Sequence, residues 1–382
     1  MKRYKNLWEK FCTYENAIKA IKLGTKNKRQ NYRVKRLVCY DDVEHNSELD
    51  PFKVDELARK LVDMLKNNKW NPSSCRHITK YFPGTGKTRE IDCPRLIDHI
   101  VQWMLILAIE EPLCRGMYEF SCGSIPKRGI EYARKHIENW VRNDSKSVWF
   151  VKLDIKKFYE SVDHGILKSM FRRVIKDERV LNIIDKVINT VERGLPIGSY
   201  TSQWFANFML QGLDHYIKEQ LYKTRRGKRV NHIRHYIRYM DDMLLIGASK
   251  SDLKKSVKCI INKLKSELNL TIKPCWEIKS TKQYPIDMIG YRFFKHYTEL
   301  RGKIFLHTKR LAKKIYKIKR RTGKVSLYHA QSMVSLYGWM KHCDSQCFIR
   351  KYIKPFINIK DMEEIISNEN KKYSITGIKG NC

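Results

Sequence analysis

This sequence of 382 residues has few acidic residues, no long apolar run and no closely spaced pair of metal-binding cysteines. No stretch approaches the roughly 18 apolar residues of a membrane-spanning helix, and residues 1–24 lack the apolar core of a signal peptide. The eleven cysteines contain no Cys-x-x-Cys motif; only Cys343 and Cys347 lie close together, a spacing more typical of reduced thiols than of a metal site. We therefore expect a cytoplasmic protein with no membrane anchor.

Positive charge is the most prominent compositional feature. Lys and Arg number 77 against 40 Asp and Glu, which gives a net charge of +37. Hydrophobic residues make up 42% and aromatic residues 11%, so the chain can form a core and is not expected to be disordered. Because so much like charge repels itself unless a polyanion neutralises it, the expected partner is nucleic acid or an anionic membrane.

Apolar periodicity and turn residues predict a mixed α+β fold with an antiparallel sheet. The expected elements are a helical region to about residue 71, a basic hairpin over 79–92 and helices over 98–111 and 130–141. The first of these two helices should end at Pro112. Next come a strand over 148–153, a helix that begins at Asp163, a helix over 202–222, and strands over 236–240 and 243–246. A helix over 253–268, a short strand over 270–272, a helix over 288–294 and further helices beyond 305 complete the prediction.

Three aspartates are the candidate catalytic residues. Asp241 and Asp242 lie between two apolar strands, and Asp154 ends another strand. Adjacent carboxylates with apolar flanks are unfavourable unless a cation neutralises them. If the sheet brings Asp154 alongside, the three suit two Mg²⁺ ions, with Mn²⁺ as a substitute, that activate a 3′-hydroxyl. A solvated turn is the alternative for an isolated Asp-Asp pair.

The residues around this pair resemble the catalytic hairpin of reverse transcriptases, Tyr-x-Asp-Asp between apolar strands. Four further segments resemble other blocks of that family in the same order, over about residues 84–352. The five segments are residues 236–245, residues 87–94 with Asp98, Val101, Gln102 and Pro112, residues 121–123 with Arg128 and Gly129, residues 151–159, and residues 195–198 with 201–203.

The resemblance implies a right-hand polymerase fold with fingers, a palm built on an antiparallel sheet, and a helical thumb. Its divisions would be a basic helical extension over 1–75, fingers over 76–147, a palm over 148–300 with finger elements interleaved, a thumb over 301–360 and a tail over 361–382.

The resemblance also implies a role for each matching position. Asp154, Asp241 and Asp242 become catalytic metal ligands, with the backbone carbonyl of Ile155. Tyr159 takes the place of the aromatic residue that excludes a ribose 2′-hydroxyl, although packing beside Phe158 is the alternative. The nucleotide-binding set is Lys87, Arg89, Tyr159, Ile197, Gly198 and Gln203; Lys273 is a possible general acid; the primer grip is Gly290 and Tyr291; and the template-primer contacts are Lys309, Arg310, Lys313, Lys314, Lys317, Arg320 and Arg321.

The biological role is left open between related systems. Only about twenty residues follow the expected thumb, so we expect no RNase H, endonuclease or integrase domain. Ile197 stands where most reverse transcriptases carry Gln, and Gln203 stands where group II enzymes carry Pro. This pattern resembles diversity-generating retroelements, whose enzymes copy a structured RNA into mutagenised cDNA together with a basic oligomeric accessory protein. A phage-defence enzyme with a non-coding RNA, or a non-catalytic RNA-binding or maturase protein, is the alternative.

The expected partners follow from these roles. They are a structured template or non-coding RNA, an RNA–DNA duplex, dNTPs and a basic accessory protein or oligomeric assembly. The cationic run over 223–229, just before the catalytic hairpin, either grips RNA or forms a solvated loop.

Overall fold

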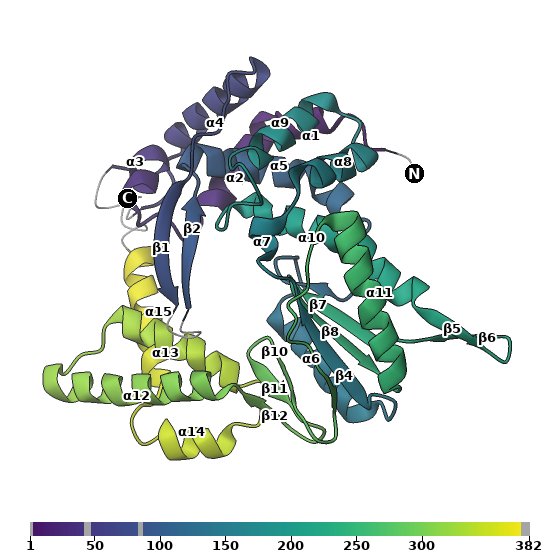
Figure 1. Ribbon diagram of the computed structural model, residues 1–382. Coiled ribbons are helices and arrows are strands. Elements are labelled where there is room, and N and C mark those ends of the chain that lie inside the picture. Colours follow the sequence, from purple (N-terminus) through teal and green to yellow (C-terminus); the bar gives the residue numbers. More distant parts are fainter. Residues whose placement is uncertain (1–2, 42–46, 83–86, 376–382) are drawn as a thin grey trace.

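A computed structural model describes residues 3–41, 47–82 and 87–375 and shows a mixed α+β fold (Figure 1). The helices are α1 (Leu7–Phe11), α2 (Tyr14–Thr25), α3 (Tyr32–Val38), α4 (Pro51–Lys66), α5 (Leu96–Cys114), α6 (Ile130–Asn143), α7 (Phe158–Ser161), α8 (His164–Val174), α9 (Glu178–Ile188), α10 (Tyr200–His215), the π-helix η1 (Tyr216–Gln220), α11 (Lys250–Leu268), α12 (Gly302–Thr322), α13 (Leu327–Met340), α14 (Gln346–Tyr352) and α15 (Ile359–Ile375). The strands are β1 (Arg76–Phe82), β2 (Lys87–Cys93), β3 (Ser121–Cys122), β4 (Trp149–Asp154), β5 (Tyr222–Arg225), β6 (Lys228–Asn231), β7 (His235–Tyr239), β8 (Asp242–Gly247), β9 (Ile278–Ser280), β10 (Ile286–Met288), β11 (Tyr291–Phe293) and β12 (Thr298–Leu300). Within these ranges, no helix has the length and apolarity to cross a membrane.

A five-stranded sheet with the order β3-β7-β8-β4-β9 forms the centre of the molecule. Successive side chains of a strand point to opposite faces, and β8 is apolar on both. Met243 and Leu245 belong to the core shared with α5, α10 and α11, whereas Leu244 and Ile246 belong to the core shared with α6 and β10–β12. Burial on both faces therefore holds β8, and the aspartates at its start, in one register.

The N-terminal helices pack around α5, which is apolar around most of its circumference. Its buried residues include Ile100, Met104, Leu105 and Leu113. The expectation that this helix ends at Pro112 is wrong, because the helix continues to Cys114. Proline removes one backbone hydrogen bond, but burial of Pro112 and Leu113 in the core stabilises the last turn.

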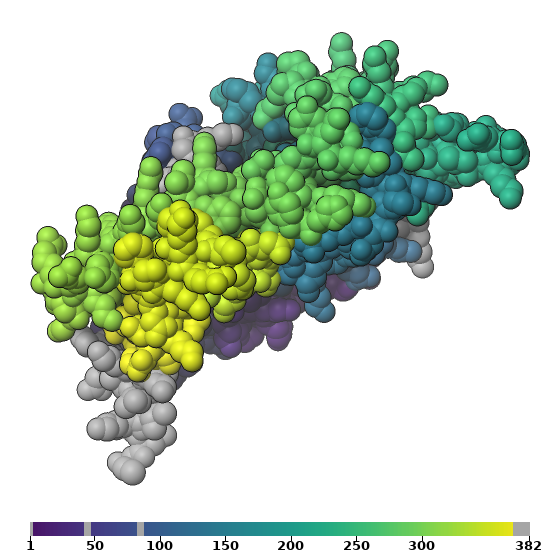
Figure 2. Space-filling view, turned by 90° about the horizontal axis from the view of Figure 1, so that it is seen from below, coloured from purple at the N-terminus to yellow at the C-terminus, as the bar shows by residue number. Residues whose placement is uncertain are grey.

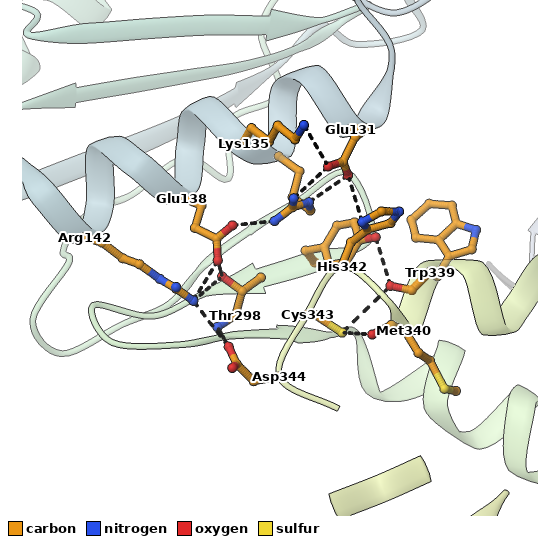
Figure 3. A network of polar contacts seen from close by, with 12 residues as sticks. Glu131, Lys135, Glu138, Arg142, Thr298, Trp339, Met340, His342, Cys343 and Asp344 are labelled. Carbon is orange, nitrogen blue, oxygen red and sulfur yellow. Dashed lines mark hydrogen bonds and ion pairs between the residues drawn. The ribbon is translucent and has the colours of Figure 1, made fainter. Parts of the chain in front are cut away.

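The three-stranded sheet β10-β11-β12 connects the central sheet to the C-terminal helices. Asp344, after α13, accepts a hydrogen bond from the Thr298 backbone N–H at 2.8 Å, and its own N–H donates to the Thr298 carbonyl at 2.7 Å. Arg142 of α6 forms ion pairs with Glu138 and Asp344 at 2.7 and 3.3 Å (Figure 3). This network joins α6, β12 and the end of α13.

Several element boundaries differ from the sequence prediction. The helix expected over 202–222 ends as the π-helix η1, and Tyr222 begins a separate hairpin, β5–β6, with every side chain exposed. Exposed strands lack the apolar alternation on which the prediction depended. The strand expected over 270–272 is a single bridge between Ile272 and Ile155. The helix expected over 288–294 is wrong, because this segment is the end of β10, a turn and strand β11, and the turn residues Ile289 and Gly290 have positive φ. The boundary expected between thumb and tail at residue 361 lies within helix α15. Met362 of this helix is buried in the C-terminal core. The turn residues 83–86 of the predicted hairpin lie outside the described ranges.

The turn between β10 and β11 generates a stability prediction. Both turn residues have positive φ, 48° at Ile289 and 89° at Gly290, and a Cβ on Gly290 would lie 2.6 Å from the Trp339 ring. Gly290→Ala should therefore lower the free energy of unfolding by about 1–3 kcal/mol. Chemical denaturation measures this change in the free energy of unfolding. Gly338→Ala is the control, because nothing lies within 4 Å of a Cβ built at Gly338. Equal stability of the two variants would contradict the close packing of Trp339 on this turn.

Candidate active site

The three aspartates meet at one end of the central sheet. Asp154 is the last residue of β4 and pairs with Asp242, the first residue of β8. Asp241 lies in the two-residue turn between Tyr239 and Asp242, after Met240 at φ 56°. The register of β4 against β8 thus brings the distant Asp154 beside the Asp-Asp pair.

A buried ion pair holds this turn from behind. Arg238 is fully buried and donates to Asp214 of α10 through Nε at 2.8 Å and Nη2 at 2.6 Å. Arg238 Nη1 also donates to the Met240 carbonyl at 2.9 Å and to Asn207 Oδ1 at 2.8 Å. Because one guanidinium binds the helix and the turn together, it restricts the backbone immediately before Asp241.

Two further hydroxyl groups complete the partners of Asp214. Ser121 Oγ of β3 and Tyr236 Oη of β7 donate to it at 2.6 and 2.7 Å. Burial and the Asp214 charge raise the pKa of Tyr236, so the phenol keeps its proton. Although burial disfavours a charged guanidinium, the Asp214 carboxylate raises the pKa of Arg238 and keeps it protonated. These charges are therefore paired and hydrogen-bonded, as buried charges must be.

Lys273 forms an ion pair with Asp154. Its Nζ lies 2.7 Å from Asp154 Oδ2, and its backbone N–H donates to the Asp154 carbonyl at 2.9 Å. The hydrogen bond to Asp154 raises the pKa of Lys273. Burial, then the charges of Asp242 and Asp154, raise the pKa of Asp241; burial and Asp154 likewise raise that of Asp242. A cation at this point would stabilise the ionised carboxylates.

The carboxylates suit a divalent cation by their chemistry. Asp154 Oδ1 is buried and has no hydrogen-bond partner in the described structure. Such an oxygen is unfavourable without a ligand, and carboxylate oxygens are the donors that Mg²⁺ prefers. Within the described ranges, no group of three or more His, Cys, Asp or Glu side chains is arranged so that it could hold a metal ion. Lys273 instead neutralises the second oxygen of Asp154.

The loop before α10 is hydrogen-bonded to strand β2 at Ile197 and packs closely against it at Gly198, two of the positions predicted to bind the nucleotide. Ile197 donates its N–H to Asp92 Oδ2 at 3.1 Å, and the Asp92 N–H donates to the Ile197 carbonyl at 2.6 Å. Gly198 has φ 116°, and a Cβ there would lie 2.6 Å from Ile91 and 2.9 Å from the Asp92 carbonyl. Only glycine fits this backbone against β2 without strain.

The other predicted nucleotide-binding residues are less uniformly placed. Tyr159 packs against the main core, and burial followed by the nearby Asp241 charge raises its pKa, whereas Arg89 lowers it. Tyr159 thus lies close enough to Asp241 and to Arg89 of β2 to be affected by both charges. Gln203 is exposed on α10. Lys87 begins β2, but its side chain lies outside the described part of the structure.

The predicted primer grip and template-primer helix lie on neighbouring elements. Tyr291 of β11 packs on Trp339 of α13 at a ring distance of 5.5 Å, and its hydroxyl donates to the Trp339 carbonyl. Helix α12 contains no acidic residue. Among the described residues, Lys319 has an ion-pair partner, Asp361, but none is found for the seven predicted contacts, Lys309, Arg310, Lys313, Lys314, Lys317, Arg320 and Arg321. The first of these, Lys309, lies over the Tyr352 ring at 4.0 Å.

Sequence reasoning missed the residues that support the aspartates. Asp214 and Asn207 were not predicted, and Ser121 and Arg238 were named only as parts of motifs. The signal was present, because Asp214 follows Leu213 on an apolar helix and Arg238 lies in an apolar strand. A charged residue at a core position requires a partner, although the sequence does not say which.

Comparisons with known proteins agree with this geometry. The profile of the family described as reverse transcriptase (RNA-dependent DNA polymerase) matches residues 66–293, more than half of the chain. The chain therefore belongs to this family. Its membership and its α+β architecture confirm the expected fold class, a right-hand polymerase fold.

Individual relatives are distant. The chain is 25% identical to protein YkfC of Escherichia coli strain K12 over 44% of this chain and 47% of that protein. It is 23% identical to the group II intron-encoded protein LtrA of Lactococcus lactis subsp. cremoris, over 56% of this chain and 46% of that protein. A solved structure of apo telomerase from Candida tropicalis matches with a TM-score of 0.44 and 12% identity, over 86% of this chain and 72% of that chain. The chain thus spans about half the length of the curated relatives that it matches.

The buried pair generates a prediction about stability. Asp214→Ala leaves the Arg238 charge buried without its carboxylate, so the free energy of unfolding should fall by about 3–5 kcal/mol. The control is Glu267→Ala, which removes an exposed pair with Lys263 and should lower it by less than about 1 kcal/mol. Urea denaturation distinguishes the two. A loss below about 1 kcal/mol for Asp214→Ala would show that the pair is not the anchor of this turn.

Proposed function

We propose that this protein is an RNA-directed DNA polymerase that extends a primer by metal-dependent nucleotidyl transfer. The observation that carries the proposal is the pairing of Asp154 with Asp242 beside Asp241, with Asp154 Oδ1 buried and unpaired in the described structure. A solvated turn, the alternative reading of the Asp-Asp pair, does not account for a third carboxylate in this register.

In this proposal, one group of residues holds the metal ions and another residue transfers a proton. Two Mg²⁺ ions, or Mn²⁺ in their place, would be held by Asp154, Asp241, Asp242 and the Ile155 carbonyl. The bound ions would supply the positive charge that activates a 3′-hydroxyl and neutralises pyrophosphate. Lys273 keeps a proton on Nζ, 2.7 Å from Asp154, and is the candidate donor to the leaving group.

Substrate selection falls to the residues between the aspartates and β2. Arg89 would bind the triphosphate together with Lys87, since a guanidinium matches phosphate oxygens. Tyr159 would lie under the deoxyribose and exclude a 2′-hydroxyl. Gly198 would let the backbone approach the base pair, and Gln203, which is exposed on α10, would contact the nucleotide. In this proposal β1 and β2 belong to the fingers and the five-stranded sheet to the palm.

Template and primer would be held mainly through phosphates. The helices α12–α14 form the proposed thumb, and the unpaired cations of α12 favour a polyanion without favouring any base sequence. Gly290 and Tyr291, fixed against Trp339, would position the primer end. The partners are then a structured template RNA, an RNA–DNA duplex and dNTPs.

The finer role that we propose is error-prone copying in a diversity-generating retroelement, with a basic accessory protein. Its support is Ile197, whose backbone is held by Asp92 and whose aliphatic side chain cannot hydrogen-bond a nucleotide. A phage-defence enzyme is the second candidate, because the same core would serve there with a non-coding RNA. The three retained aspartates argue against a non-catalytic maturase.

Substitution of the aspartates tests the polymerase assignment. Asp242→Asn should lower Mg²⁺-dependent dNTP incorporation on a primed RNA by at least about 10³-fold, because several kcal/mol of transition-state stabilisation are lost. RNA binding should change little, since the cations that bind phosphates lie elsewhere. Glu277→Gln, an exposed carboxylate, is the matched control. Incorporation by Asp242→Asn at the wild-type rate would refute the assignment.

Replacement of Ile197 tests the finer role. Ile197→Gln restores one possible hydrogen bond near the incoming nucleotide, worth about 0.5–1.5 kcal/mol or roughly two- to twelvefold in discrimination. Since retroelement enzymes of this kind misincorporate opposite template adenine, errors there should fall more than at other bases. Deep sequencing of cDNA from a defined RNA measures this. Equal error rates at adenine for both proteins would favour the defence role.

A further inference from the structure

The hairpin arm, which we define as residues 222–231, projects from the molecule beside α11 (Figure 1). Its two strands pair from Tyr222 with Asn231 to Arg225 with Lys228, and the turn residues Arg226 and Gly227 have φ of 50° and 72°. All eight strand residues are exposed. An isolated two-stranded hairpin has no core of its own, so its shape depends on how its base is held.

The base of the arm is held by specific contacts. Lys223 Nζ forms an ion pair with Asp252 of α11 at 2.5 Å, and the Arg229 guanidinium lies over the Tyr222 ring at 4.1 Å. The His232 N–H donates to the Leu221 carbonyl at 2.9 Å, which closes the neck of the arm. The arm is thus an ordered projection and not the solvated loop that the sequence left as one alternative.

The tip concentrates positive charge that the fold does not neutralise. Arg225 and Lys228 lie directly opposite each other, and Arg226 occupies a left-handed turn position that favours Asn or Gly. Like charges in direct cross-strand pairs destabilise a hairpin. Across the residues that the structure describes, no carboxylate pairs with any of these three side chains. Lys254, Lys255 and Lys258 of α11 are also exposed, and they extend the basic surface from the base of the arm.

The arm lies far from the proposed thumb. Figures 1 and 2 both show the arm at one end of the molecule and α12 at the other. A short duplex held between the aspartates and α12 would therefore not reach the arm. A ligand for the arm must extend beyond the catalytic site.

We propose that the hairpin arm is a second RNA-binding site, which takes the phosphate backbone of a structured part of the template RNA outside the copied segment. The proposal rests on the proposed function for the identity of the RNA as template. Charge complementarity carries the choice of a polyanion. An anionic membrane fits less well, because Val230 is the arm's single exposed aliphatic residue and the Arg229 guanidinium lies over one face of the exposed Tyr222 ring.

Two arm variants test the proposal. The first replaces Arg225, Arg226 and Lys228 with Gln and keeps the base contacts. The second replaces residues 222–231 with Asn-Gly, which can close the neck because Leu221 and His232 are already hydrogen-bonded. A control variant carries Lys60→Gln, Lys66→Gln and Lys69→Gln, three exposed lysines in or just after α4 with the same loss of charge.

Each protein is assayed with two probes. One is a short RNA–DNA primer-template, and the other is the same primer-template extended by a long RNA stem-loop. Both arm variants should bind the long probe about tenfold or more weakly, and the triple Gln variant should lower the log-log salt slope by about 2–3. Extension of the short probe should keep its wild-type rate. The control variant should match wild type with both probes.

Other outcomes would overturn the assignment. Wild-type binding and salt slope for both arm variants would exclude the site, as would an equal loss in the control variant. Arm-dependent binding to phosphatidylserine vesicles, without arm-dependent binding to RNA, would assign the arm to a membrane. The two proposals can fail separately. If wild type extends no primer, but the arm substitutions still weaken binding of the long probe in an Asp242→Asn background, the polymerase proposal fails and the arm assignment stands.

Discussion

The ion pair between Arg238 and Asp214 is the constraint on which the rest of the site depends. Both side chains are fully buried, and the four donors on Asp214 come from β3 and β7. The same guanidinium binds the Met240 carbonyl at the turn that carries Asp241. Because a buried charge tolerates few arrangements, this network gives the catalytic turn one conformation relative to α10. Asp241 and Asp242 are therefore held next to each other by the backbone of the turn and, within the described residues, not by ion pairs of their own side chains.

Charge is distributed in opposite senses over the centre and the ends of the molecule. At the centre, the three aspartates lie close together, Lys273 forms an ion pair with Asp154, and the charges of Lys152 and Arg301 act on Asp242. At the two ends, α12 and the hairpin arm carry cations with few acidic neighbours (Figure 2). Such a distribution attracts a polyanion to the periphery and leaves negative charge where a divalent cation is needed. The cations at the two ends and the carboxylates at the centre are therefore separate sets of residues, and each set can be substituted without changing the other.

The elements that the sequence predicted well are those with a buried face. Strands β4, β7 and β8 and helices α5, α6 and α11 all carry apolar residues at the period of their structure, and each lies within a few residues of its prediction. The arm and the end of α10 were mispredicted because their residues are exposed and polar, so no periodicity marks them. Pro112 was taken as a helix end because local rules do not include the core that stabilises the last turn of α5.

The sequence by itself determined the basic character of the protein, the α+β class and the three aspartates, since these depend on composition and on residues close together in the chain. Tertiary structure alone decided that Asp154 faces Asp242, that Lys273 neutralises Asp154, and that Asp92 holds Ile197. Each of these contacts joins segments far apart in sequence, and strand register and helix packing specify them. Local patterns name the residues that need a partner; only the folded chain selects the partner.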